Sequence, residues 1–383
     1  MLRQFMPHIL MAASAAAAGF AASIRTAVAD EIRLSGPYEH DNLALYFVHG
    51  KSAEGPVPLT LDEALARDRV VVHETGTVAE LKIENTGEED VLVHAGDIVK
   101  GGKQDRVVTT TFILKPKSGA TPLAVFCVES GRWAARGSES VAAFASAEEM
   151  MPSREAKMAM KRSLAGHDEE FERRPRAFSA EREARRQARE QGESPAEIEQ
   201  SQSAFEDGEG PANYQSEIWS RVGEIQDKLS RIVGAKVAAS ASESSLQLAL
   251  ENERLAKAQQ AYVDALKERG ETADDVVGLV FAVNGHINSA DIYGSNGLFK
   301  KLWAKLLKAS ATEALSHKDD PSKDPAPSIE TVQAFLESSS SAKEDTLEPV
   351  AGVKLKARET SAVFDSETES ASGALLHRNV LAH

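Results

Sequence analysis

Segments with strand periodicity occur towards both ends of this chain, and segments with helical periodicity lie between them. Residues 78–84 alternate polar and apolar side chains, which is the two-residue period of a half-buried strand. Asn284-Gly285 predicts a tight hairpin, because both residues tolerate the positive φ of a type I′ turn. Further strands are expected at 43–48, 70–72, 90–94, 106–114, 122–129, 276–283, 286–293, 353–358, 362–364 and 374–380.

The helical segments show apolar residues at spacings of three and four. Thr60 with Glu63 is a capping-box pattern and predicts a short helix over 60–67. Other helices are expected at 153–165, 214–233, 246–266, 297–315 and 329–336. We therefore predict an α+β fold of mostly antiparallel sheets with packed helices, in which the C-terminal strands close the domain.

The first 29 residues have the pattern of a secretory signal peptide. Arg3 precedes an apolar, alanine-rich run over 9–24, and Ala27-Val28-Ala29 is a small-x-small cleavage signal. We expect cleavage after Ala29 and a periplasmic or secreted protein, the alternative being a retained N-terminal anchor or an ordinary helix. No later stretch is apolar enough to span a bilayer.

Charged residues are unevenly distributed along the rest of the chain. Lys and Arg total 44 against 59 Asp and Glu, and this net charge of −15 argues against a nucleic-acid partner or an anionic membrane. Residues 168–212 are dense in Glu and Arg and predict an insertion of charged helical arms or partly disordered chain, whereas 316–349 predict a flexible linker that holds one short helix. Both would belong to one α+β domain spanning 30–383.

A glycine-rich segment, "GDIVKGGKQDRVV" at 96–108, is the first candidate for a site. It places Lys103, Gln104 and Arg106 beside glycines that allow close backbone approach, and lysine and arginine suit an anionic group. The segment is not a phosphate-binding Walker loop, because Gly102 stands where lysine is required. The alternative is a decorated β-turn.

A second candidate follows an apolar strand, in "PLAVFCVESGRW" at 122–133. Glu129 would act as a general base, Arg132 as an anion clamp and Trp133 as a stacking platform at the strand end. The alternative for Glu129 and Arg132 is a structural salt bridge.

Cys127 is the only cysteine, so no intrachain disulfide can form. A lone strand cysteine is typical of a small buried hydrophobe. Thiol catalysis would need a histidine base, for which His73 and His94 are candidates only through their positions near strand ends. The histidines show no metal-binding spacing, and we predict no metal site.

These two motifs, with "SEIWSRV" at 216–222, "GLVFAVNG" at 278–285 and "LFKKLWAKLL" at 298–307, occur in the order of a known family. The chain resembles the bacterial domain of unknown function named for its association with ADP-ribosylglycohydrolases and rhodanese-phosphatase-superfamily proteins. The resemblance implies a mixed α/β domain and a link to ADP-ribose or nucleotide-derived ligands. It implies no reaction and no catalytic residues.

Three functions follow from these observations. The first is an exported ligand-binding or accessory domain that recognises a nucleotide- or sugar-phosphate-like anion through Lys103, Gln104, Arg106, Arg132 and Trp133. The second is a hydrolase of a phosphate- or ribose-bearing substrate with Glu129 as general base. The third is a structural or protein-interaction role through the charged arms.

Overall fold

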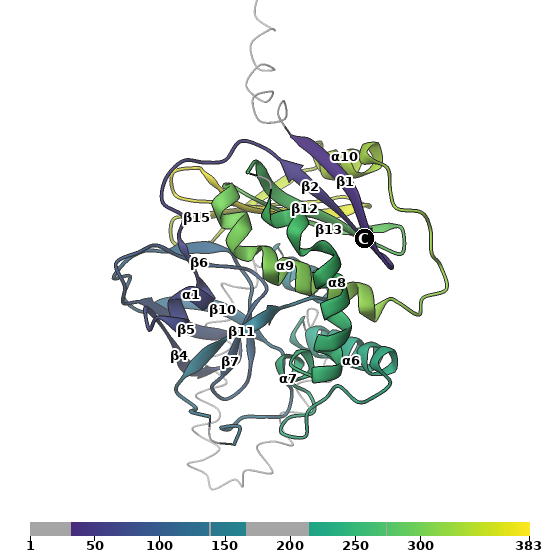
Figure 1. Cartoon of the computed structure of the whole chain (residues 1–383). Coiled ribbons are helices and arrows are strands. Elements are labelled where there is room, and N and C mark those ends of the chain that lie inside the picture. The colour runs from purple at the N-terminus through teal and green to yellow at the C-terminus, as the bar shows by residue number, and fades with distance from the viewer. Residues whose placement is uncertain (1–31, 138, 166–213, 273) are drawn as a thin grey trace, which may run out of the picture.

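The computed structural model describes residues 32–137, 139–165, 214–272 and 274–383, and it confirms the predicted α+β class (Figure 1). The predicted signal peptide and the charged insertion at 168–212 lie outside these residues. The largest sheet is antiparallel and orders β1 (Arg33–His40), β2 (Leu43–His49), β12 (Val276–Val283), β13 (His286–Tyr293), β17 (Leu375–Ala382), β16 (Val363–Glu369), β15 (Val353–Glu359) and β14 (Glu344–Val350).

Two smaller sheets come from the first half of the chain. The six-stranded sheet orders β11 (Phe144–Met150), β7 (Asp97–Gly101), β8 (Arg106–Val108), β10 (Thr121–Cys127), β5 (Glu80–Asn85) and β4 (Val70–Thr77). A three-stranded sheet orders β3 (Leu59–Thr60), β6 (Val91–Val93) and β9 (Phe112–Leu114), with β3 and β6 parallel.

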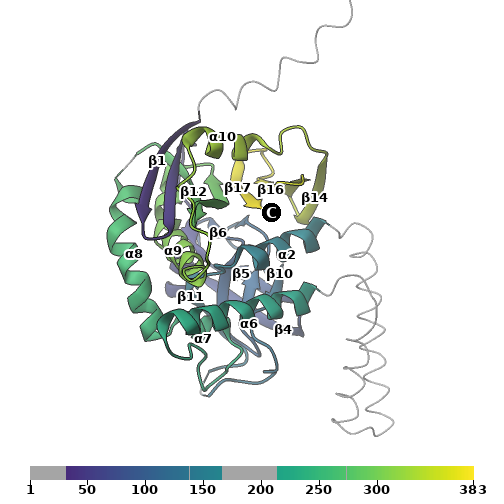
Figure 2. The same cartoon turned by 90° about the vertical axis from the view of Figure 1, so that its right-hand side faces the viewer.

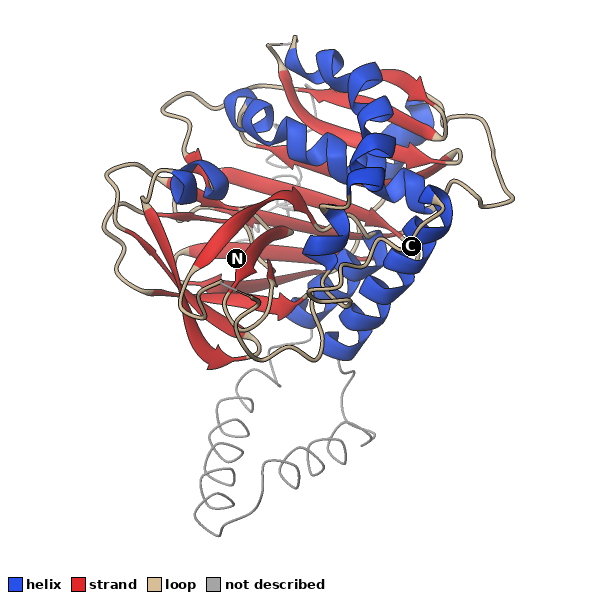
Figure 3. Cartoon of the chain, turned by 60° about the horizontal axis from the view of Figure 1, so that its bottom comes forward, coloured by secondary structure: helices blue, strands red, loops and turns tan. Residues whose placement is uncertain are grey.

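The helices gather mainly on one side of the molecule (Figure 3). Helices α2 (Arg154–Ala165) and α6 (Tyr214–Val233) run side by side (Figure 2). The remaining described helices are α1 (Leu61–Ala66), α7 (Leu246–Leu250), α8 (Glu253–Glu271), α9 (Asn296–Ser316) and α10 (Ile329–Glu337). No helix among the described residues combines the length and apolar character needed to cross a bilayer.

The central strands of the eight-stranded sheet are covered on both faces, which explains their continuous apolar sequences. Every residue of β2 and β12 is buried. On one face Phe47 packs against Trp303 of α9, with ring centroids 5.4 Å apart. On the other face Tyr46 belongs to a core cluster with Val332 of α10.

Local signals in the sequence are confirmed where they concern turns and caps. The side chain of Thr60 accepts a hydrogen bond from the backbone N–H of Glu63, and the Glu63 carboxylate accepts one from the backbone N–H of Thr60, as a capping box requires. Asn284 and Gly285 have φ of 52° and 83°, both positive as the hairpin turn demands. A Cβ at Gly285 would also lie 2.3 Å from the carbonyl oxygen of Asp324.

Other expectations require correction. The helix expected over 246–266 is two helices, because Asn252 caps a second one with its side chain. The segment 316–349, expected to be a linker with one short helix, contains that helix as α10. It also contains most of β14, a polar edge strand that was not expected because its sequence lacks apolar alternation. The glycine-rich segment contains a strand, β7, before its tight turn.

Helix α9 packs in the core, and one of its lysines is buried there. Lys305 is 8% exposed, and its Nζ lies 2.7 Å from Asp62 Oδ1 and 3.2 Å from Asp97 Oδ1. Burial raises the pKa of Asp97 to about 6, despite the opposing effect of Lys305. This ion pair joins α9 to the first residue of β7.

We expect Lys305→Met to lower the free energy of unfolding by about 3–5 kcal/mol, because it leaves the Asp97 carboxylate buried without its partner. Chemical denaturation of the purified chain would measure the change. Lys300→Met is the matched control on the same helix, since Lys300 pairs with the exposed Asp274, and its cost should stay below about 1 kcal/mol. Equal losses of unfolding free energy in both variants would contradict a stabilising ion pair between Lys305 and Asp97.

Candidate functional site

The turn between β7 and β8 lies directly against the segment that follows β10. The Gln104 side chain donates from Nε2 to the carbonyl oxygen of Glu129 at 3.0 Å. The backbone N–H of Asp105 donates to Glu129 Oε2 at 3.0 Å, and Arg132 Nη1 donates to the carbonyl oxygen of Gly102 at 3.0 Å. The structure therefore brings together the two segments that the sequence singled out.

Gly102 permits this close packing. Its φ of 54° is left-handed, and a Cβ there would lie 2.2 Å from Cζ of Phe144 at the start of β11. The neighbouring strands continue the arrangement, because Arg106 of β8 pairs in register with Cys127 of β10. Sequence distance separates these elements, but strand pairing makes them one structural unit.

Arg132 has no donor left for a ligand. Its Nε donates to Glu129 Oε1 at 2.6 Å and its Nη2 to Glu129 Oε2 at 2.7 Å. Its remaining three N–H groups face the carbonyl oxygens of Gly101, Gly102 and Ala134. Since a guanidinium has five donors, all are engaged within the chain. Arg132 thus positions the two segments, which agrees with the salt-bridge interpretation.

Glu129 is equally committed. Burial acts to raise its pKa, but hydrogen bonds from Arg132, Ser242 and the Asp105 backbone outweigh burial and hold the pKa below its ordinary value. Its side chain has no exposed surface. An ionised carboxylate gripped in this way is a poor general base.

A second buried ion pair, which the sequence did not reveal, completes this cluster. Arg136 binds Asp105 through both terminal nitrogens, at 2.8 and 3.2 Å. Ser245, the N-cap of α7, donates to the same carboxylate at 2.8 Å. Arg136 lies in an irregular segment, so no periodic pattern marked it.

Arg106 presents the opposite situation. Its side chain is fully buried, and Nη1 donates a long hydrogen bond of 3.4 Å to Gln104 Oε1. Among the described residues, Nε and Nη2 have no hydrogen-bond partner, which leaves at least three of the five N–H donors unused. The Cζ of Arg106 lies 5.7 Å from the ring centroid of Trp133.

Trp133 and Lys103 lie at the surface above this guanidinium. Trp133 is 44% exposed, and Lys103 Nζ lies 4.9 Å from the centroid of its ring. The backbone N–H of Lys103 donates to Glu74 at 3.2 Å, so one carboxylate also borders the group. The arrangement is an exposed aromatic ring in contact with one partly exposed and one buried cation.

Among the residues that the structure describes, no base contacts the Cys127 thiol. Its Sγ donates to Gln104 Oε1 at 3.0 Å, and neither His73 nor His94 is among its hydrogen-bonding contacts. Burial raises the pKa of the thiol to about 11, although Arg106 acts to lower it. The thiol is therefore protonated at neutral pH and behaves as the buried group that the sequence suggested.

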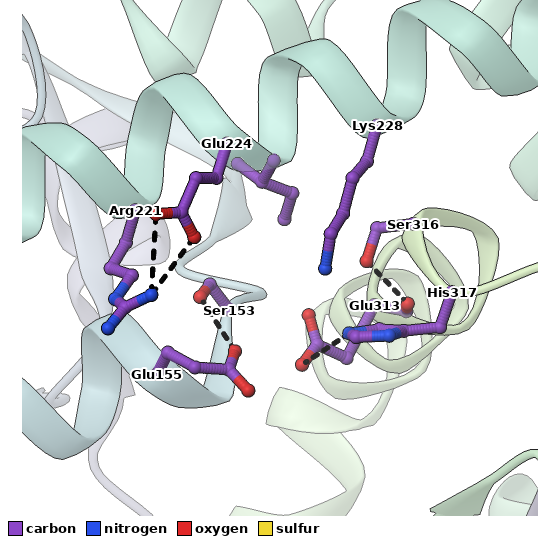
Figure 4. Close-up of a pocket in the computed structure, with 9 residues that line it drawn as sticks. Ser153, Glu155, Arg221, Glu224, Lys228, Glu313, Ser316 and His317 are labelled. Atoms are coloured by element: carbon purple, nitrogen blue, oxygen red, sulfur yellow. Dashed lines mark hydrogen bonds and ion pairs between the residues drawn. The ribbon is translucent and has the colours of Figure 1, made fainter. Parts of the chain in front are cut away.

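A polar cavity of about 160 Å3 lies between α2, α6 and α9 (Figure 4). Glu155, Glu313 and Lys228 point into it, and His317 lies at its edge. Burial and the nearby Glu155 raise the pKa of Glu313. Burial also acts to raise the pKa of Glu155, but Arg154 outweighs it and lowers this pKa. Sequence spacing did not reveal this carboxylate pair.

Two groups of described residues have the chemistry to hold a metal ion. One is Glu155, Glu313 and His317 in the cavity. The other is the buried set His94, Asp291 and His377, in which burial lowers the pKa of both imidazoles. Their members lie up to 283 residues apart (377 − 94), so sequence spacing could not bring them together.

Comparison with known families identifies one match. The model of the ARG and Rhodanese-Phosphatase-superfamily-associated Protein domain matches residues 31–176 and 165–383. No curated protein and no solved structure matches the chain.

We expect Glu129→Gln to destabilise the fold by about 3–5 kcal/mol at pH 7, because Arg132 would lose its buried counter-ion. Since the folded-state pKa of Glu129 is lowered, this contribution is present above its ordinary pKa of 4.5 and is lost as the pH falls through the folded pKa. The gap in unfolding free energy between wild type and variant should therefore narrow below pH 4.5.

Glu139→Gln is the control, since Glu139 meets Arg136 at 3.1 Å but is one-third exposed. Its cost should stay within about 1 kcal/mol. A pH-independent gap for Glu129→Gln, or an equal cost for both variants, would contradict the buried ion pair.

Proposed function

This chain belongs to the ARG and Rhodanese-Phosphatase-superfamily-associated Protein domain family, and we propose that it is an exported protein that binds an anionic, nucleotide- or sugar-phosphate-like ligand. Lys103, Arg106 and Trp133 would contact the ligand. Gln104, Glu129 and Arg132 would position these groups through the hydrogen bonds that join the β7–β8 turn to the segment after β10.

The observation that supports this proposal is the unused hydrogen-bonding capacity of Arg106. A buried guanidinium without a counter-ion is costly, and the cluster around it supplies none. Glu129 is engaged by Arg132, and Asp105 by Arg136. An entering phosphate or carboxylate oxygen would meet donors that no protein group uses, and arginine binds such groups through two parallel hydrogen bonds.

Trp133 and Lys103 favour a ligand with a flat ring as well as a charge. An exposed tryptophan stacks on aromatic bases, and Lys103 at its face adds a second positive charge. A nucleotide carries both features. The Trp133 side chain lies over Arg106, so ligand entry requires the irregular segment that carries it to shift.

A hydrolase is the second function that a specific observation favours. Glu129 is unsuited to the role of base, but the cavity carboxylates Glu155 and Glu313 have pKa values shifted in opposite directions. Such a pair is typical of a general acid with a general base. An interaction role through the arms at 168–212 concerns residues outside the described structure.

We expect ADP-ribose or AMP to bind the mature chain and to change Trp133 fluorescence. Lys103→Ala and Trp133→Phe should each weaken binding about tenfold or more, equivalent to about 1.4 kcal/mol. Lys100→Ala is the matched control, because Lys100 lies on the adjoining strand and pairs with Glu251 at 2.6 Å. Fluorescence titration and thermal shift would measure both effects.

Arg106→Met separates ligand binding from folding in the same assays. Replacing an unpaired buried charge with an apolar side chain should leave the unliganded protein as stable as wild type or up to about 4 kcal/mol more stable, while binding is lost. No saturable binding by wild type, or full binding by Arg106→Met, would overturn the proposal. Phosphate release that Glu313→Gln abolishes would favour the hydrolase instead.

The export part of the proposal rests on the N-terminal pattern. When the full chain is expressed in a Gram-negative host, we expect its product to be recovered from the periplasm with Asp30 as the first residue. Ala29→Leu should block processing, because the cleavage site requires a small residue there. N-terminal sequencing after fractionation measures this, and a cytoplasmic product that retains residues 1–29 would contradict export.

A further inference from the structure

We propose that His94, Asp291 and His377 form a site for a divalent first-row transition ion, of the zinc or iron(II) type. The site is separate from Arg106 and Trp133 and does not rest on the proposed function. Two imidazoles and one carboxylate are the ligand set of many such centres, and they leave further coordination positions open.

The fold places these side chains on facing elements. Asp291 lies on β13 and His377 on β17, the neighbouring strand, on the sheet face that His94 approaches from the turn between β6 and β7. The rings of His94 and His377 have centroids 4.6 Å apart. One ligand atom from each of the three residues lies within 4.8 Å of the other two. Bonds of about 2.0–2.2 Å to one ion need these atoms to be about 3.4 Å apart, which requires only small side-chain adjustments.

Each expected ligand is also held by an outer partner. His94 Nε2 lies 2.9 Å from the Tyr293 hydroxyl, and His377 Nδ1 lies 3.0 Å from Thr111 Oγ1. Asn379 donates to Asp291 Oδ1 at 2.9 Å. Metal-binding histidines are commonly oriented through their second nitrogen in this manner.

These partners leave one nitrogen of each histidine for the ion. His94 Nδ1 has no hydrogen-bond partner among the described residues. Because His94 is only 1% exposed, bulk solvent does not satisfy this nitrogen either. His377 Nε2 lies 2.9 Å from Asp291 Oδ1, so an ion between them would replace this bond with two coordinate bonds. The unused nitrogen of His94 is the independent sign that a partner is missing from the cluster.

The unpartnered nitrogen of His94, and not the charge nearby, favours this group over the cavity group. Lys228 and Arg221 line the cavity that holds Glu155, Glu313 and His317, and they oppose a cation there. Lys161 and Lys157 of α2 also act electrostatically with Asp291, so the proposed site has opposing charges of its own. Removing the charge of Lys161 or Lys157 should therefore strengthen metal binding rather than weaken it.

The test uses the mature chain, freed of metal with a chelator and titrated with Zn2+ and Co2+ by calorimetry and absorption spectroscopy. We expect one ion per chain and a Co2+ spectrum of nitrogen and oxygen ligation. His94→Gln should weaken binding at least about 100-fold, and Tyr293→Phe about 10-fold or more through loss of the outer partner. Lys161→Met should tighten binding.

Two control variants keep the test independent of folding. Tyr262→Phe removes another buried tyrosine hydroxyl, which contacts Asn42 at 2.9 Å, and should leave the affinity unchanged. Glu313→Gln alters the cavity group and should do the same. Absence of stoichiometric Zn2+ and Co2+ binding by wild type would overturn the proposal. Binding that Glu313→Gln abolishes and that His94→Gln and Tyr293→Phe retain would also overturn it.

Discussion

Two carboxylates without solvent contact, Asp105 and Glu129, hold the first half of the chain to the helices that follow. Asp105 is bound by Arg136 and by Ser245 at the start of α7, and Glu129 is bound by Arg132. Removing a carboxylate from water is costly unless its oxygens are satisfied, so the chain segments that bring these partners are tightly constrained. The position of Trp133 next to Arg106 depends on this constraint.

Arg132 and Arg106 differ in how many of their hydrogen-bond donors the protein itself uses. Arg132 uses every donor inside the protein, whereas Arg106, which is more deeply buried, uses few. Both side chains are cationic, and both follow glycine-rich turns in the sequence. Their hydrogen-bond partners, which only the folded chain reveals, make Arg132 a structural clamp and leave Arg106 with unused donors.

Local chemistry explains which elements could be predicted. The capping box at Thr60 and the turn at Asn284 involve residues close in sequence. Strand β12 has a continuous apolar sequence, and β13 was predicted as the return strand of the hairpin. Strand β14 was missed because it is polar and lies at a sheet edge, so its stability comes from pairing with β15. The two candidate segments were recognised from their glycines and charges. That every N–H donor of Arg132 is used could not be predicted, because some of its acceptors are carbonyl groups of another turn. Asp291 and His377 meet only because β13 pairs with β17.

The order of strands in the eight-stranded sheet has a consequence for how the protein is made. Strand β2 pairs with β12, so Leu43 lies opposite Val283, and β13 in turn needs β17 near the C-terminus. Contacts this distant in sequence form slowly, and here they require nearly the whole chain to have been synthesised. During translation β1 and β2 can pair with each other, but the other edge of β2 remains unpaired until β12 has been synthesised. The two smaller sheets use only strands from the first half of the chain, so the eight-stranded sheet is the part of the fold that can be completed only at the end of synthesis.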